Sequence, residues 1–227
     1  GDSAGQASDW DGIQVGSGAS TATVDFDRVQ VRFGDQMDVS TSAPGGVSIR
    51  NSVFSDNAYG GLWVSSGGST PRVQDNQFHR NGTGTSSTRY AGLYVSSTAI
   101  DLDLLTGNTG TGNGLDATLL SGTVSQDGTW PNTPGWPVSV GSGYDPYYYA
   151  SLTIAAGVTV TVPAGTVVKF GQSSRLQING SLTATGTEAS PVVFTSWRDD
   201  TAGGDTNNNG DSAGQASDWD GIQVGSG

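Results

Sequence analysis

The chain lacks several residue types on which protein chemistry commonly depends. Among its 227 residues there is no cysteine, one histidine (His79), one lysine (Lys169) and one glutamate (Glu188). The absence of cysteine excludes disulfide bonds and thiol chemistry. A histidine-based triad or metal cluster could draw on His79 alone. Because Lys169 lies in a segment of alternating apolar and polar residues, we expect it to face outward rather than to act as a nucleophile.

Positive charge is also scarce. Nine lysine and arginine residues stand against 21 aspartate and glutamate residues, which gives a formal net charge of −12. No basic cluster is present, so nucleic acid and anionic membranes are poor partners and cations are better ones. No apolar run approaches the length of about 18 residues that a transmembrane helix needs. We therefore predict neither nucleic-acid binding nor membrane insertion for this segment.

What is abundant is typical of short strands joined by turns. The chain contains 36 glycines, is 33% hydrophobic and only 13% charged, and has no run with helical apolar spacing. Apolar and polar residues alternate most clearly at 151–154, 158–162, 166–170, 175–178, 181–185 and 192–196. The composition predicts an all-β protein long enough to bury a substantial core.

One stretch, GDSAGQASDWDGIQVGSG, occurs twice without a single change, at residues 1–18 and 210–227. Identity over this length defines a sequence period of 209 residues. We therefore divide the chain into residues 1–209, one full period, and residues 210–227, the start of the next identical repeat. A tandem array is the expected parent, and a segment duplicated in cloning is the alternative.

A second, degenerate repeat occupies the middle of the chain. Ile49 aligns with Val73 and Phe54 with Phe78, at an offset of 24 residues, and a weaker third copy follows Leu104. A recurrence of about 22 to 25 residues is typical of a coil whose turns must stack to bury their apolar faces. Phe54 and Phe78 should then stack inside. Asparagines should lie at the corners and bond to the neighbouring turn: Asn51, Asn57, Asn76, Asn81, Asn108 and Asn113.

Two phrases carry a resemblance to a known group of proteins. Residues 49–64 look like the repeat of right-handed parallel β-helix proteins, and residues 152–200 closely resemble the recurring unit of large bacterial surface and extracellular β-helix proteins. The resemblance is strong over about residues 151–224 and more generic over 1–120. It implies a right-handed parallel β-helix, an extracellular or cell-surface location, and a group that contains both pectin-active enzymes and inert fibres.

The sharpest chemical motif is a possible calcium loop. Asp205, Asn207, Asn209 and Asp211 place oxygen ligands at alternate positions, with a glycine sixth, as in the first half of a calcium-binding loop. The twelfth position is Ala216 rather than the bidentate glutamate of an EF-hand. A Ca²⁺ ion would therefore need further carboxylates to close the site, and a solvated polar loop is the alternative.

Catalysis would require carboxylates that converge in one groove. The available pairs are Asp25 with Asp27, Asp101 with Asp103, and Asp199 with Asp200. Alternation makes the first two pairs the outward polar face of half-buried strands, so we do not expect an enzyme. Four tyrosines indicate either outer packing or a platform for carbohydrate: Tyr144, Tyr147, Tyr148 and Tyr149.

These observations favour a structural role. Identical repeats have nothing variable with which to build a different site in each copy, so we expect a repeat of an extracellular fibre, stalk or adhesin whose partners are neighbouring copies of itself. At about nine turns of about 4.8 Å, one period should rise on the order of 43 Å. The alternatives are a polysaccharide lyase or glycoside hydrolase, and a carbohydrate-binding adhesin without catalysis.

Overall fold

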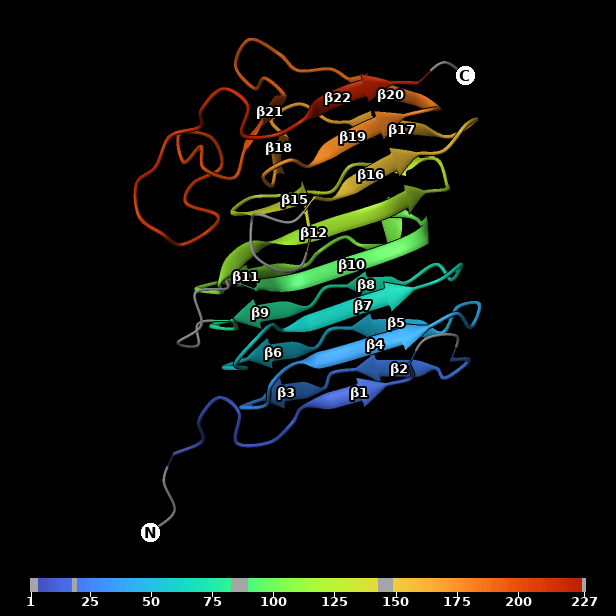
Figure 1. Ribbon diagram of the computed structural model, residues 1–227, viewed down its shortest axis with the longest axis vertical. Coiled ribbons are helices and arrows are strands. Elements are labelled where there is room, and N and C mark those ends of the chain that lie inside the picture. Colours follow the sequence, from blue (N-terminus) through green and yellow to red (C-terminus); the bar gives the residue numbers. More distant parts are fainter. Residues whose placement is uncertain (1–3, 18–19, 83–89, 143–148, 226–227) are drawn as a thin grey trace.

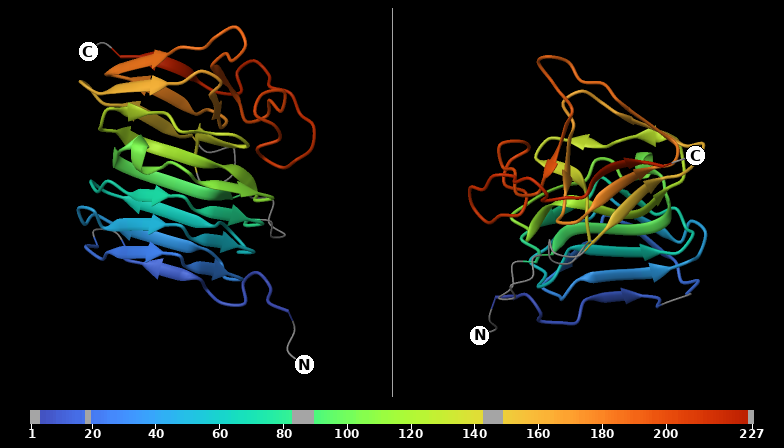
Figure 2. Two further views of the ribbon diagram at one scale, coloured as in Figure 1. Left: turned by 180° about the vertical axis from the view of Figure 1, so that it is seen from behind. Right: turned by 45° about the horizontal axis from the view of Figure 1, so that its top comes forward.

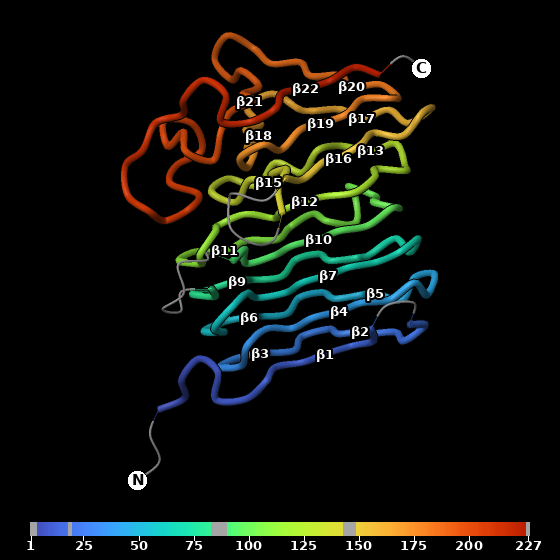
Figure 3. The backbone as a smooth tube through the Cα atoms, in the orientation of Figure 1, coloured from blue at the N-terminus to red at the C-terminus, as the bar shows by residue number. Residues whose placement is uncertain are grey.

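The computed structural model describes residues 4–17, 20–82, 90–142 and 149–225. Its strands form a column of stacked coils, with the first strand, β1, at the bottom and the last strand, β22, at the top (Figure 1). A tube through the backbone shows each coil lying on the one before it (Figure 3). No helix within these residues has the length and apolar character that a membrane crossing demands.

One large sheet runs the whole height of the column, and all but one of its pairings are parallel. Its lower part consists of β1 (Ile13–Val15), β4 (Met37–Thr41), β7 (Leu62–Ser66), β10 (Ala91–Ile100) and β12 (Leu115–Val124). Above β12 the sheet divides, because the first half of this long strand pairs with β15 (Trp136–Val140) and the second half with β16 (Ser151–Ile154). The β15 branch continues through β18 (Val167–Phe170) to β21 (Val193–Ser196), and the β16 branch through β19 (Arg175–Ile178) to β22 (Gly221–Val224).

Three smaller parallel sheets form the other walls of the coil. One contains β2 (Val24–Asp27), β5 (Val47–Arg50) and β8 (Arg72–Gln74), and another β3 (Gln30–Arg32), β6 (Val53–Ser55), β9 (Gln77–His79) and β11 (Thr109–Thr111). The third, in the upper half, contains β13 (Gly128–Thr129), β17 (Thr159–Val162) and β20 (Ser181–Ala184). A 3₁₀ turn, η1 (Leu102–Leu104), and the short β14 (Asn132–Thr133), antiparallel to β15, complete the set. The predicted parallel β-helix is confirmed.

The core lies inside the coil and follows from the alternation in sequence. In β4, Met37 and Val39 are fully buried, whereas Asp38 and Ser40 are only partly buried. Stacking of equivalent positions places the ring centroids of Phe54 and Phe78 5.2 Å apart with nearly parallel ring planes. The ring of Trp136, from β15, stacks in a similar way on Phe78, with centroids 5.7 Å apart. The predicted register of Phe54 on Phe78 is confirmed.

Buried asparagines form two ladders at the corners of the lower coils. The Asn57 amide donates to Asn81 Oδ1 at 2.9 Å, and the Asn81 amide donates to Asn113 Oδ1 at 2.8 Å. In the second ladder the Asn76 amide donates to Asn108 Oδ1 at 3.1 Å. All five are at most 1% exposed, and their amides also bond backbone carbonyls, so no polar cost of burial is left uncompensated.

Asn51 also lies at a corner and bonds to the neighbouring coil, as predicted, but it does so in a different way from the five buried asparagines. It is exposed, has a left-handed backbone (φ 51°), and donates to Asp27 Oδ1 at 2.7 Å. The buried position in its corner belongs to the next residue, Ser52, whose N–H donates to Asn76 Oδ1 at 2.9 Å. At this corner, Asn51 has the left-handed backbone and is exposed, whereas the adjacent Ser52 is buried and bonds to the neighbouring coil.

The expected nine turns per period is wrong. Seven parallel pairings lead from β1 to β22, the two copies of the same strand: β1 to β4, β7, β10, β12, β16, β19 and β22. At about 4.8 Å per pairing, one period rises about 34 Å. The error comes from long connections, since Leu62 pairs with Leu93, 31 residues later, and Leu176 with Ile222, 46 residues later.

Candidate functional site

The repeated segment folds in the same way at both ends of the column. The serine at the eighth position of the segment has a left-handed backbone in each copy, with φ 65° at Ser8 and 71° at Ser217. The aspartate that follows this serine accepts a hydrogen bond from the N–H three residues earlier, at 2.8 Å for Asp9 in the first copy and 2.9 Å for Asp218 in the second. These short-range bonds are made within the segment itself, so the eighteen-residue sequence dictates its own turn before the strand.

The first copy is covered only from above, by the next coil of the column. Within the described residues its strand, β1, pairs with β4 alone. The N–H of Ile13 donates to the carbonyl of Gln36 at 3.1 Å, and the carbonyl of Trp10 accepts from the N–H of Asp35 at 3.1 Å. The opposite edge of β1 has no partner strand in the part of the chain that the structure describes.

The second copy is covered only from below, by the coil that precedes it. Its strand, β22, pairs with β19 alone among the described residues. The N–H of Gly225 donates to the carbonyl of Ile178 at 2.8 Å, and the carbonyl of Asp218 accepts from the N–H of Ser173 at 3.3 Å. Gly225 corresponds to Gly16 of the first copy, which comes three positions after Ile13. In a β-strand the N–H groups of successive residues point to opposite edges, so two N–H groups three positions apart also point to opposite edges. The two copies therefore pair through opposite edges of the same sequence.

Apolar side chains that face the core are only partly covered at both ends. In the first coil Ile13, Val15, Phe26 and Val29 are partly buried against the core, whereas their counterparts in the interior coils are fully buried. The last coil shows the same incomplete cover: Leu182, Val192, Phe194, Trp219 and Ile222. Val224 is 78% exposed. Each end of the column thus presents an apolar face bordered by unpaired strand edges.

Between β21 and β22 the chain leaves the column in a long excursion, residues 197–220, which we call the arm. It stands beside the upper coils in Figures 1 and 2. It bonds to the start of β12, where the N–H of Asp116 donates to the carbonyl of Thr206 at 2.7 Å and the Asn208 amide donates to the carbonyl of Asn113 at 2.7 Å. At its base Trp197 is buried in a second apolar cluster with Leu115, Ala117 and Leu119. These contacts hold the arm, the segment that leads into β22, against the side of the column.

Lys169 lies beneath the arm. Its neighbours Val168 and Phe170 belong to the core, so Lys169 points outward as expected, but it is 0% exposed because the arm covers it. Its ammonium donates to the carbonyl of Gly204 at 2.6 Å. Burial lowers the pKa of Lys169 below its usual value, and the nearby carboxylates of the arm oppose that shift only in part. The only lysine of the chain thus anchors the arm to β18.

The four residues of the predicted calcium loop lie together on the arm but in different environments. Both carboxylate oxygens of Asp205 accept backbone N–H groups, from Asn209 at 3.2 Å and Gly210 at 2.9 Å. Asn207 is buried, whereas Asn209 and Asp211 are exposed. Among the described residues there is no group of three or more carboxylates or histidines placed to hold a metal ion. Calcium binding here stays a prediction.

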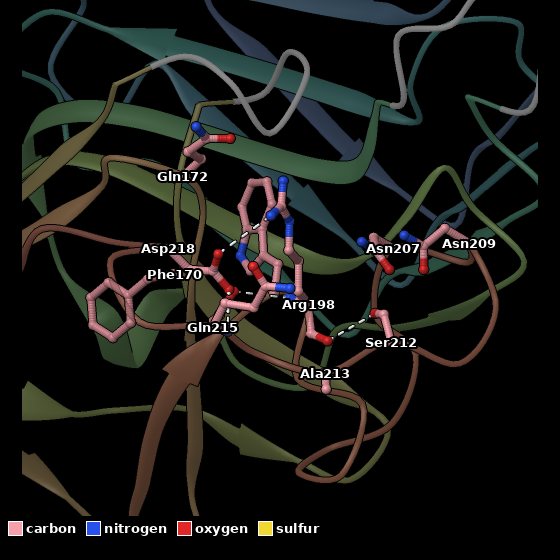
Figure 4. Close-up of a pocket in the computed structure, with 11 residues that line it drawn as sticks. Phe170, Gln172, Arg198, Asn207, Asn209, Ser212, Ala213, Gln215 and Asp218 are labelled. Atoms are coloured by element: carbon pink, nitrogen blue, oxygen red, sulfur yellow. Dashed lines mark hydrogen bonds and ion pairs between the residues drawn. The ribbon is translucent and has the colours of Figure 1, made fainter.

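A pocket of about 400 Å³ opens between the arm and the column (Figure 4). Phe170 and Gln172 line it from the column, and Arg198, Gln215 and Asp218 from the arm. Arg198 and Asp218 form an ion pair at 3.4 Å, drawn as a dashed line in Figure 4. The pocket is lined largely by amides and hydroxyls around this neutralised pair, a set suited to an uncharged hydroxylated ligand. Carbohydrate binding stays a prediction.

The carboxylate pairs considered for catalysis all take part in local bonds. Asp25 pairs with Arg50 at 2.8 Å, and Asp103 accepts the N–H of Thr129 at 3.0 Å. The others accept hydrogen bonds from nearby groups: Asp27 from Asn51, Asp101 from the N–H of Asp103, Asp199 from Thr195, and Asp200 from the N–H of Ser212. Of the tyrosine group, Tyr149 is 52% exposed with the Arg175 guanidinium 5.1 Å from its ring centre. Tyr144, Tyr147 and Tyr148 lie outside the described residues.

Comparison with known families gives one result, and it agrees with the architecture. The model of a family described as "right handed beta helix region" matches residues 5–123, more than half of the chain. Neither the search of curated proteins nor the search of solved structures returned a match. The parallel sheets, the stacked asparagines and this match agree, and the chain belongs to the right-handed β-helix family.

Proposed function

We propose that this chain is a structural repeat of a long β-helical fibre or stalk, located outside the cell, in which successive copies stack end to end. One observation carries the proposal. The same strand sequence occurs at both ends of the large sheet, and its two copies pair through opposite edges. Among the described residues, the edge that one copy uses has no partner strand in the other copy.

In the proposed fibre, one strand of this sequence lies between two repeats. It pairs downward with β19 of one repeat, as β22 does, and upward with β4 of the next, as β1 does. Both sets of backbone bonds can form at once because they come from opposite edges of the strand. The unpaired edges, which invite association with other strands, are thereby removed from solvent.

The apolar end faces supply a driving force for this stacking. The next coil would cover the partly buried side chains of the terminal coils, and Val224, now 78% exposed, would become internal. Complete burial of one valine side chain contributes about 1.5 to 2 kcal/mol. The occupant of these faces is a further copy of the same repeat, since only that copy brings a β4 strand already matched to this sequence.

A structural role also agrees with the state of the carboxylates. A polysaccharide lyase or hydrolase needs acidic groups free to bind a metal or transfer protons. Those at the positions we considered bond to arginine side chains, hydroxyls or backbone N–H groups instead. An acidic chain without cysteine is compatible with an extracellular or cell-surface location.

A chain that carries the 209-residue period twice tests the proposal. We expect a single rigid particle that is about 34 Å longer than the one-period chain, seen by small-angle scattering and negative-stain electron microscopy. Ile222→Asn at the junction should break the continuity because the side chain faces the core. Gln223→Asn, its exposed neighbour on the same strand, is the matched control and should leave the particle unchanged.

The opposite result is equally clear. Two bodies joined at a variable angle, unfolding at the melting temperature of the one-period chain, would show that the repeats do not stack. The proposal would then be wrong even if each repeat folds as a complete β-helix.

A further inference from the structure

The repeated segment contains a tryptophan whose surroundings differ between the two copies. In the first copy the indole N–H of Trp10 donates to the carbonyl of Arg32 at 2.8 Å. Its ring lies against the backbone of Gly34, where an added Cβ would be 3.0 Å from the indole. Both contacts come from the coil above, and Trp10 is still 41% exposed. One set of indole contacts is therefore made by the coil that comes after the segment.

In the second copy Trp219 is covered from the other side. Its ring stacks on Phe170 with centroids 4.1 Å apart and an interplanar angle of 11°. It is partly buried against the core. No described residue accepts a hydrogen bond from its indole N–H. This set of contacts comes from the coil that precedes the segment.

We propose that, at each junction of the fibre, a single tryptophan makes both sets of contacts at once. Its ring stacks on Phe170 of one repeat, while its N–H bonds to the Arg32 carbonyl of the next and its ring packs on that repeat's Gly34. This inference rests on the proposed end-to-end function. A buried tryptophan with its N–H satisfied is a typical centre of an interface.

The arrangement also gives the junction a direction. The lower side contributes an aromatic face and the upper side a carbonyl group and a glycine without a side chain. A repeat added in the reverse orientation would offer the tryptophan neither Gly34 nor the Arg32 carbonyl. The tryptophan therefore selects head-to-tail stacking.

Comparing Trp219→Ala in the one-period and two-period chains tests this inference. In the one-period chain the substitution removes only the stack on Phe170, whereas at the central junction of the two-period chain it removes all the contacts. We expect the loss in free energy of unfolding, measured by urea denaturation, to be at least about twofold larger in the two-period chain. Trp10→Ala is the matched control, because Trp10 is terminal in both chains and should cost the same in each.

A second measurement needs no destabilised variant. With 5-fluorotryptophan incorporated, the ¹⁹F resonance of Trp219 should shift and lose its solvent isotope effect in the two-period chain, while that of Trp10 should not change. Trp10→Phe and Trp219→Phe assign the two signals. A continuous two-period particle in which Trp219 stays accessible, and in which Trp219→Ala has equal effects in both chains, would overturn this inference alone. A discontinuous particle would instead overturn the proposed function.

Discussion

The two copies of the repeated segment are the same in sequence, share the backbone turn before the strand, and differ in burial. Asp9 and Asp218 bond to the same neighbouring N–H, and Gly12 and Gly221 have similar left-handed backbones, with φ 85° and 95°. Yet Asp9 is exposed and Asp218 is 8% exposed. The comparison separates two causes: local sequence sets the shape of the segment, and the neighbouring coil sets the environment of each side chain.

The difference also shows that one residue can have two roles. Asp9 only closes its turn, whereas Asp218 closes the same turn and pairs with Arg198, a residue of the arm. In the proposed fibre every internal copy would combine the surroundings of both. In that fibre, the two copies seen here would each correspond to one half of a junction.

The largest difference in stability between equivalent substitutions in the two copies should come from Gly12→Ala and Gly221→Ala. Both force an alanine into a left-handed backbone, at a cost of about 1 to 2 kcal/mol. At Gly12 the new Cβ would also overlap the carbonyl oxygen of Gln36, adding about 1 to 3 kcal/mol. At Gly221 nothing lies within 4 Å. We expect a clearly lower urea midpoint for Gly12→Ala, with hydrogen exchange at the Ile13 N–H as the local measurement.

The same pair of variants sharpens the comparison in the two-period chain. There Gly221 gains a Gln36 above it, so Gly221→Ala should become as costly as Gly12→Ala. Equal midpoints already in the one-period chain would contradict the steric argument.

A smaller effect concerns how stability depends on pH near the second copy, because only that copy is preceded by a described arm, which covers Lys169. Burial lowers the folded-state pKa of Lys169 below the value of 10.5 expected in the unfolded chain. Between these two pKa values the unfolded chain binds more protons, so the free energy of unfolding rises with pH through this site. We expect the melting temperature of the native chain to rise relative to Lys169→Met as the pH increases from 7 toward 10. A difference that does not change with pH would show that Lys169 is not buried as a charged group.

The regular parts of the fold could be predicted from sequence because their contacts repeat at a fixed spacing. Alignment of Phe54 with Phe78 and of Asn57 with Asn81 is enough to place them in adjacent coils. Asn51 lies at a corner and bonds to the adjacent coil as predicted, but the pattern does not separate its left-handed position from the buried position beside it. The predicted number of turns is too high because the regular coils do not reveal the long connections elsewhere.

The candidate site could be predicted only in part. The repeated strand is evident, but sequence does not say which of its edges is paired. The burial of Lys169 depends on Gly204, 35 residues away on an irregular segment, and the docking of Asn208 on Asn113 spans 95 residues. Such contacts leave no periodic signal. The one available sign is the long stretch without clear alternation that follows residues 192–196.

The smallest expected effect concerns calcium, which would distinguish the copies because Asp205, Asn207 and Asn209 precede only the second. A bound Ca²⁺ ion would have to compete with the two N–H groups that Asp205 already accepts, so only weak binding is expected. At a calcium concentration equal to the dissociation constant, binding adds about 0.4 kcal/mol to the free energy of unfolding. This corresponds to a rise in melting temperature of about 1 to 2 °C for a chain of this size.

Differential scanning calorimetry with millimolar Ca²⁺ and then with chelator measures this rise in melting temperature. Asp205→Ala should abolish the rise, Asp211→Ala should reduce it, and Asp9→Ala, in the copy without the loop, should preserve it. A melting temperature that chelator leaves unchanged would make the loop a purely structural turn, held by Asp205 alone.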